Sequence, residues 1–217
     1  ADVAHSVVGS KAMSAIGKGL HKGVEMPLWT PSLPKNYRFK EGRVVATEHK
    51  DKVVYFPSCI NQTMGVDKAS RHIRPLVEEM MSLFEKAGYE VILPKAMDRL
   101  CCGTIWESKG MPETADKKLR ELEDALWEAS EQGKYDVVCD QSPCLYRMKE
   151  KISKIHLYDS AEFVWKKMRD RLEFVQTDTP IAIHLTCSTR KMGIEEAIVG
   201  LANLCSSKVL LPEGGGC

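Results

Sequence analysis

The cysteines are the residues of this chain that are best suited to chemistry. Six of the eight follow short apolar segments that are typical of β-strands, namely Cys59, Cys101, Cys102, Cys144, Cys187 and Cys217. Cysteine thiolates bind iron–sulfur clusters and zinc, and neighbouring thiols exchange disulfides. The spacing therefore predicts a thiol-based redox or metal site.

Three chemistries remain open for these thiols. Zinc sites usually contain closely paired C-x2-C ligands, and this sequence has no such pair. A disulfide between the adjacent Cys101 and Cys102 would be strained and therefore reactive. Several thiols gathered at one edge of a fold favour an iron–sulfur cluster. An electron-transfer module is thus the first hypothesis, and a thiol–disulfide reductase and a zinc-stabilised docking domain are the alternatives.

Two cysteines are predicted to serve packing rather than chemistry. Cys139 lies inside the apolar segment DVVCD (136–140), and Cys205 ends the apolar segment AIVGLANLC (197–205). Free cysteine is among the most buried residue types and behaves as a small apolar side chain. We therefore expect both thiols to lie in the core.

The elements that must position these thiols alternate between short apolar strands and longer helices. Such alternation predicts an α/β fold with a mostly parallel sheet. Predicted strands cover 53–56, 91–93, 137–138, 155–158, 181–185 and 209–211, and predicted helices cover 67–87, 112–132, 143–151, 160–173 and 193–204. The six cysteines then lie at the carboxyl ends of strands, which is the edge where open α/β sheets bind ligands. Helix N-termini meet the same edge and favour negative charge there.

An internal repeat divides the chain. Residues 53–65 read VVYFPSCINQTMG and residues 181–193 read IAIHLTCSTRKMG, so that Cys59 matches Cys187. Downstream, EVILP (90–94) precedes the Cys101–Cys102 pair and KVLLP (208–212) precedes Cys217. The repeat predicts duplicated Rossmann-like units, with the second copy truncated inside its motif and the chain a fragment of a longer protein. The predicted domains are an N-terminal helix and linker (1–49), a first unit (50–178) and the start of a second unit (179–217).

Composition sets limits on the class of protein. The chain has 217 residues, of which 43% are hydrophobic and 28% charged, with a net charge of +1. Acidic and basic residues are interspersed, so we expect no nucleic-acid partner. No apolar run reaches the roughly 18 residues of a membrane span. We expect a cytoplasmic protein, located in the cytosol or peripherally at the inner membrane.

The cysteine pattern resembles that of a known family. Cys59, Cys101-Cys102-Gly103 and Cys144, followed by a partial second copy, are similar to the CCG or cysteine-rich domain of iron–sulfur oxidoreductases. The closest resemblance is to the C-terminal region of bacterial FAD-linked D-lactate dehydrogenases. It rests on three phrases, FPSCINQTMG (56–65), HLTCSTRKMG (184–193) and LPEGGGC (211–217).

The resemblance implies a [4Fe–4S] cluster, of the non-cubane type in the best understood relatives, bound by five cysteines of one motif. Four of those positions are occupied here by Cys59, Cys101, Cys102 and Cys144. Gln141 stands where the family has the remaining cysteine, which leaves open a four-cysteine cluster or one completed by Cys139. In the second copy, Cys187 and Cys217 match.

The resemblance also implies partners. Electrons would pass from FAD in a separate domain to this module, and then to an acceptor such as a quinone or a cytochrome. A flavin dehydrogenase domain and a ferredoxin-like segment would belong to the same polypeptide. The chain would thus be part of an oxidoreductase for a 2-hydroxy acid, most closely D-lactate, and this piece alone would lack dehydrogenase activity.

Overall fold

The computed structural model describes residues 9–24, 28, 51–66 and 73–212. The chain divides into two compact units, one formed by 1–40 and 60–79 and the other by 41–59 and 80–217. Cys217 and most of the predicted linker lie outside the described residues. The predicted domain limits at 49/50 and 178/179 remain predictions.

The smaller unit contains the predicted N-terminal helix. Helix α2 spans Ser10–Val24, within the segment 1–49 for which the sequence predicts a helix and a linker. Its apolar side chains Ile16, Leu20 and Val24 are exposed. In the same unit, Arg74 and Glu79 form a two-pronged ion pair, with donor–acceptor distances of 2.8 and 2.7 Å.

The larger unit is built on a four-stranded parallel sheet in the order β2-β1-β3-β4. The strands are β1 (Asp51–Phe56), β2 (Tyr89–Ile92), β3 (Val137–Cys139) and β4 (Leu157–Asp159). In the central strand β1, the side chains of residues 53–56 are all buried, as expected for a sheet covered on both faces. The α/β fold with a parallel sheet, predicted from the alternation of elements, is confirmed.

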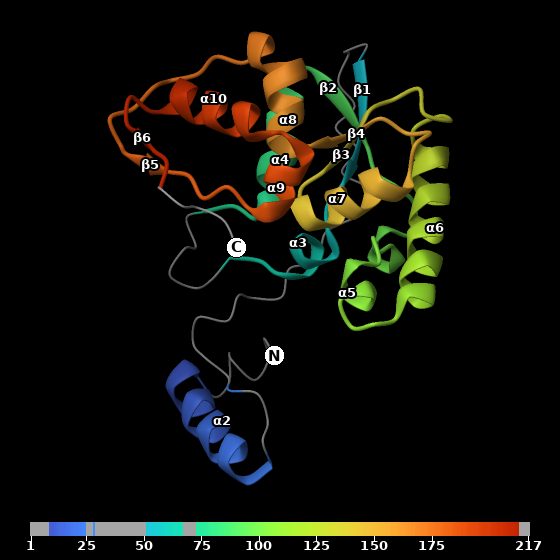
Figure 1. Cartoon of the computed structure of the whole chain (residues 1–217). Helices are drawn as coiled ribbons and strands as arrows, with labels where there is room; N and C mark the ends of the chain where they lie inside the picture. Colours follow the sequence, from blue (N-terminus) through green and yellow to red (C-terminus); the bar gives the residue numbers. More distant parts are fainter. Residues whose placement is uncertain (1–8, 25–27, 29–50, 67–72, 213–217) are drawn as a thin grey trace. The chain divides into compact units, whose positions relative to one another are not determined.

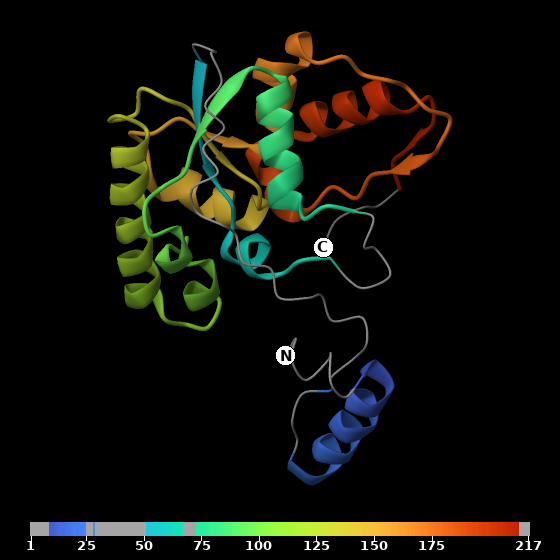
Figure 2. The ribbon, with the colours of Figure 1, turned by 180° about the vertical axis from the view of Figure 1, so that it is seen from behind.

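Helices cover both faces of this sheet. Helix α7 (Ser142–Lys151) lies on the front of the sheet in Figure 1, and the reversed view in Figure 2 brings α4 (Leu76–Lys86) to the front. On the α4 face, Phe84 packs against Tyr55 of β1 with ring centroids 5.5 Å apart. Phe84 also packs edge-on against Phe163 of α8 (Ser160–Phe163), at 6.0 Å. These aromatic contacts fix α4 and α8 on one face.

Two further helices follow β2 along the chain. Helix α5 (Thr104–Glu107) is a single turn, and α6 (Pro112–Ala129) begins at a proline and buries Ala115, Leu119, Leu122 and Leu126. A 3₁₀ turn (Met97–Arg99) joins β2 to the segment that carries Cys101. The helix predicted for 160–173 is instead α8 followed by a π-helical turn (Val164–Met168) and a 3₁₀ turn (Arg169–Arg171).

The second copy of the repeat forms its own parallel pair. Strand β5 (Ile181–Ala182) pairs with β6 (Val209–Leu210), just as β1 pairs with β2. Helix α9 (Cys187–Met192) follows β5, and α10 (Glu195–Cys205) precedes β6. A Cβ at Gly200 of α10 would lie 2.5 Å from the Trp165 ring, so α10 contacts the π-helical turn through a glycine. Among the described residues, no helix has both the length and the apolar character needed to cross a bilayer.

Candidate functional site

The candidate site lies where the chain changes direction in the sheet. From β1 the chain passes to β2 at one edge, and then crosses to β3 on the other side of β1. Phe56 and Cys139 are register partners at the ends of β1 and β3. Cys59 therefore follows β1, and Cys144 follows β3, at the carboxyl edge on either side of this switch point. Parallel α/β sheets bind ligands at such a position.

The Cys101–Cys102 pair reaches this edge from β2. Cys102 is buried and Cys101 is half-buried. Gly103, with φ of 86°, turns the chain into α5, and its amide donates a hydrogen bond to Sγ of Cys101 at 3.4 Å. The Cys102 thiol donates to Oγ1 of Thr104 at 3.2 Å. A Cβ on residue 103 would lie 2.3 Å from the carbonyl oxygen of Ala115, so this loop rests directly on α6.

Four thiols form a chain in which each affects the ionisation of the next. The pKa values link Cys59 with Cys101, Cys101 with Cys102, and Cys102 with Cys144. The neighbouring thiols of Cys102 and then of Cys59 lower the pKa of Cys101. The pKa of Cys102 is raised by Cys101, by Cys144 and by burial, and the pKa of Cys144 is lowered by Cys102. Cys102 thus keeps its proton between two thiols, Cys101 and Cys144, that lose theirs more readily.

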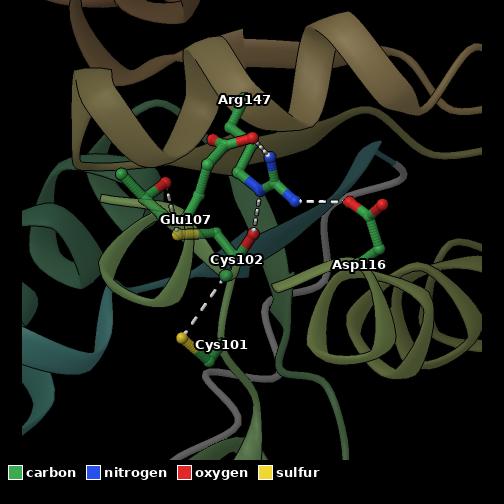
Figure 3. Close-up of polar contacts among 7 residues, drawn as sticks. Cys101, Cys102, Glu107, Asp116 and Arg147 are labelled. Carbon is green, nitrogen blue, oxygen red and sulfur yellow. Dashed lines mark hydrogen bonds and ion pairs between the residues drawn. The ribbon is translucent and has the colours of Figure 1, made fainter. Parts of the chain in front are cut away.

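A buried arginine lies behind this loop. The side chain of Arg147, on α7, is only 3% exposed. Its Nε donates to the carbonyl oxygen of Cys102 at 3.1 Å, and its Nη2 donates to Oδ1 of Asp116 at 2.6 Å. Nη1 forms a further ion pair with Glu107 of α5 (Figure 3). Sequence reasoning missed Arg147, although a charged residue one turn after Cys144, between the apolar Leu145 and Met148, is an available signal.

An aspartate fixes the end of β1. Oδ2 of Asp140 accepts a hydrogen bond from the Tyr55 hydroxyl at 2.7 Å, and Oδ1 accepts one from the Ser58 amide at 2.8 Å. Asp140 directly follows β3, and Ser58 directly precedes Cys59. The carboxylate therefore ties the turn that carries Cys59 to the neighbouring strand. Sequence reasoning did not select it.

The remaining cysteines have different environments. Cys139 is fully buried and donates a weak hydrogen bond to the carbonyl oxygen of Gln141 at 3.9 Å, and burial raises the pKa of its thiol well above its ordinary value. The prediction that it packs in the core is confirmed. Cys205 is exposed, because α10 turns its last residue outward, and the prediction of a buried thiol there is wrong. Cys187 starts α9 and lines a pocket of about 380 Å³ whose other walls come from α5 and α7.

The arrangement of the thiols bears on which centre they could hold. Among the described residues, no group of three or more His, Cys, Asp or Glu side chains is arranged around one metal ion. A cluster does not need such convergence, because each iron takes its own cysteine ligand. The four linked residues are all cysteines, which is the ligand type that clusters require.

Comparisons with known proteins add no assignment. No model of a protein family matches this chain, and neither a curated protein nor a solved structure matches it.

Proposed function

We propose that this chain is an iron–sulfur electron-transfer module whose cluster is held by Cys59, Cys101, Cys102 and Cys144. One observation carries the proposal, namely that Cys59, the Cys101–Cys102 pair and Cys144 follow three neighbouring parallel strands, β1, β2 and β3, at the switch point of the sheet. These cysteines come from three separate segments of the sequence. Packing alone gives no reason for four thiols from three loops to meet at a ligand-binding edge.

The chain's own residues support the site in separate ways. Asp140 holds the turn before Cys59, and the Gly103 amide donates to the sulfur of Cys101. Amide hydrogen bonds of this kind stabilise anionic sulfur. Cys102 is buried, which limits the access of water to the centre of the site. A cluster bound there would supply reversible one-electron transfer.

The proposal extends to a parent enzyme. The phrases around Cys59 and Cys187 support placing this module in a flavin-linked 2-hydroxy-acid dehydrogenase, with D-lactate as the first substrate to test. Flavin in another domain would oxidise the substrate, and the module would carry electrons toward a quinone or a cytochrome. A cytoplasmic or peripheral inner-membrane location follows from that role. The isolated module would not oxidise the hydroxy acid.

A second function is favoured by the geometry of the adjacent pair. The Gly103 amide donates to Sγ of Cys101, whose pKa is lowered, while the pKa of the adjacent Cys102 is raised. A stabilised thiolate beside a protonated thiol is the arrangement used in disulfide exchange. In that case Cys101 would attack a disulfide of the substrate, and the resulting mixed disulfide would be resolved by Cys102. Both cysteines would end as a disulfide, and the substrate would be released as two thiols.

Anaerobic reconstitution tests the two functions. The 217-residue chain is incubated with ferrous iron and sulfide, and iron, sulfide and zinc are measured together with the EPR spectrum of the reduced protein. We expect iron and sulfide to bind, and we expect Cys102→Ser to lose most of both. Cys205→Ser is the matched control, because Cys205 is exposed and lies outside the chain of four thiols.

Other outcomes would contradict the cluster. Zinc bound in stoichiometric amount with no iron after reconstitution would refute it, and so would a Cys102→Ser variant with an unchanged EPR signal. A titratable disulfide between Cys101 and Cys102, formed in protein that binds no iron, would instead support the reductase.

A further inference from the structure

The buried side chain of Arg147 lies outside the set of thiols but contacts the loop that carries two of them. Figure 3 shows its guanidinium between Glu107 and Asp116, with the Cys102 carbonyl oxygen at its third side. The partners lie 45, 40 and 31 residues away from it in the sequence. Burying a charged group costs several kcal/mol unless it is paired and hydrogen-bonded. A single side chain therefore ties α7 to α5, to α6 and to the Cys101–Cys102 loop.

The spacing on α7 makes this contact specific to the thiol site. Cys144 and Arg147 are three residues apart on the helix, so their side chains lie on the same face. Cys144 lies near enough to the Cys102 thiol to raise its pKa, and Arg147 donates to the carbonyl oxygen of the same residue. One helix therefore presents both a thiol and a guanidinium to Cys102. A shift of the loop along α7 would break the bond to Arg147 and move Cys102 away from Cys144.

The charge of Arg147 is screened less than the charges that balance it. Its side chain is 3% exposed, whereas those of Glu107 and Asp116 are 51% and 43% exposed. Water screens exposed charges strongly and buried charges weakly. The three groups sum to −1, but the guanidinium is the member whose charge water screens least, and it lies against the Cys102 peptide. A positive charge at that place stabilises whichever state of a bound centre carries more negative charge.

We propose that Arg147 is a positioning residue of the thiol site, which fixes the Cys102 peptide and raises the reduction potential of the centre bound there. The potential rises because reduction adds one negative charge close to a buried cation. This inference rests on the proposed iron–sulfur function for its second part. Its first part, the fixing of the loop, concerns the metal-free protein as well.

Opposite changes in charge test the effect on the potential. The midpoint potential of reconstituted protein is measured by optical or EPR titration for Arg147→Gln, Asp116→Asn and Arg147→Lys. We expect Arg147→Gln to lower the potential and Asp116→Asn to raise it. We expect Arg147→Gln to lower the ratio of reduced to oxidised centre at least tenfold at a fixed applied potential. A tenfold change in this ratio corresponds to a shift of 59 mV in the midpoint potential for one electron. Arg147→Lys should stay nearer to the wild type, because it keeps the charge.

Hydrogen exchange tests the positioning role without iron. In metal-free protein, amide exchange across 101–104 should be faster in both Arg147→Gln and Arg147→Lys, since neither side chain can make all three contacts of the guanidinium. The control is Arg171→Gln. Arg171 pairs with Asp51 at 2.7 Å, at the start of β1 and therefore at the opposite edge of the sheet. That variant should change neither the exchange across 101–104 nor the potential.

The outcomes separate this inference from the function on which it rests. If the wild type binds no iron, the proposed function fails, and the exchange rates still decide the positioning role. Exchange at the wild-type rate in both Arg147 variants would overturn that role. Potentials that shift in the same direction in Arg147→Gln and Asp116→Asn, or that do not shift, would overturn the electrostatic role. If Arg147→Gln fails to fold, the proposal is tested by Asp116→Asn and Glu107→Gln, which keep the arginine. Each of these variants removes a negative charge beside it, so the midpoint potential must rise in both.

Discussion

Replacement of Gly103 by alanine tests how tightly the cysteine loop is built. The backbone at Gly103 has φ of 86°, a left-handed conformation that costs an L residue about 1–2 kcal/mol. The added Cβ would also lie 2.3 Å from the carbonyl oxygen of Ala115, where ordinary contacts begin near 3.4 Å. The loop and α6 must then separate by about an ångström, and such overpacking costs about 1–3 kcal/mol. We expect a total loss of about 3 kcal/mol in the free energy of unfolding.

Gly110 provides a matched control for this variant. It also has a positive φ, 74°, but a Cβ there would meet no atom within 4 Å. Gly110→Ala should therefore show only the backbone cost of about 1–2 kcal/mol. Both substitutions lower the entropy of the unfolded chain equally, so this effect cancels in the comparison. The difference between the variants isolates the contact between the loop and α6.

Urea unfolding followed by circular dichroism measures the difference. If the slope of the free energy of unfolding against urea concentration is unchanged, the urea concentration at the midpoint should fall further for Gly103→Ala than for Gly110→Ala. A difference of about 2 kcal/mol corresponds to roughly 4–8 °C in melting temperature for a chain of this size. Because the Gly103 amide donates to Cys101, the same variant should take up less iron. Equal losses of stability in the two variants would refute the close contact with α6.

Three further predictions concern neighbouring groups. The Cys139→Ala variant should still bind iron and should lose about 1 kcal/mol in the free energy of unfolding, because this buried thiol only packs. The Cys144→Ala variant should lose iron. Loss of iron in Cys139→Ala would show that Cys139 is a ligand. The pKa of Cys144 is lowered by Cys102 and raised, in decreasing order, by burial, by Cys101 and by Asp140. Asp140→Asn should therefore lower this pKa further, so that alkylation of Cys144, followed by mass spectrometry, is faster in metal-free protein. Burial raises the pKa of Asp159 in the folded state, so its contribution to stability is present below its unfolded pKa and is lost as the pH rises through the folded value. In urea titrations at a series of pH values, Asp159→Asn should abolish this fall of the free energy of unfolding with rising pH. An unchanged dependence of the free energy of unfolding on pH in the variant would contradict the role given to Asp159.

The strands were predictable because their apolar segments are short and bounded by turns. Every predicted strand overlaps an observed one, and the parallel pairing of β5 with β6 repeats that of β1 with β2. The segment 160–173 was less predictable. Its apolar positions are consistent with one long helix, but the structure widens the helix to a π turn at Val164–Met168 and closes it with a 3₁₀ turn. Local propensity does not reveal such changes of helical winding.

The groups that support the thiols were harder to predict than the strands, because their roles depend on contacts across the sequence. Arg147 resembles an ordinary residue of a charged helix until α5 and α6 enclose it. Asp140 resembles a turn residue until the register of β1 and β3 places it beside Ser58. Cys205 ends an apolar segment, yet only packing determines which face of α10 is covered. A single sequence contains no direct information on these distant neighbours.

The order of the strands explains why the first copy forms a thiol site. Cysteines after β1 and β2 alone would bring Cys59 together with the Cys101–Cys102 pair. The placement of β3 on the other side of β1 adds α7, and α7 contributes both Cys144 and Arg147. The pair β5 and β6 repeats the first two strands, but among the described residues no third strand joins that pair. The thiol site of the first copy therefore depends on the third strand and the helix that follows it, because these elements place Cys144 and Arg147 beside the Cys101–Cys102 loop.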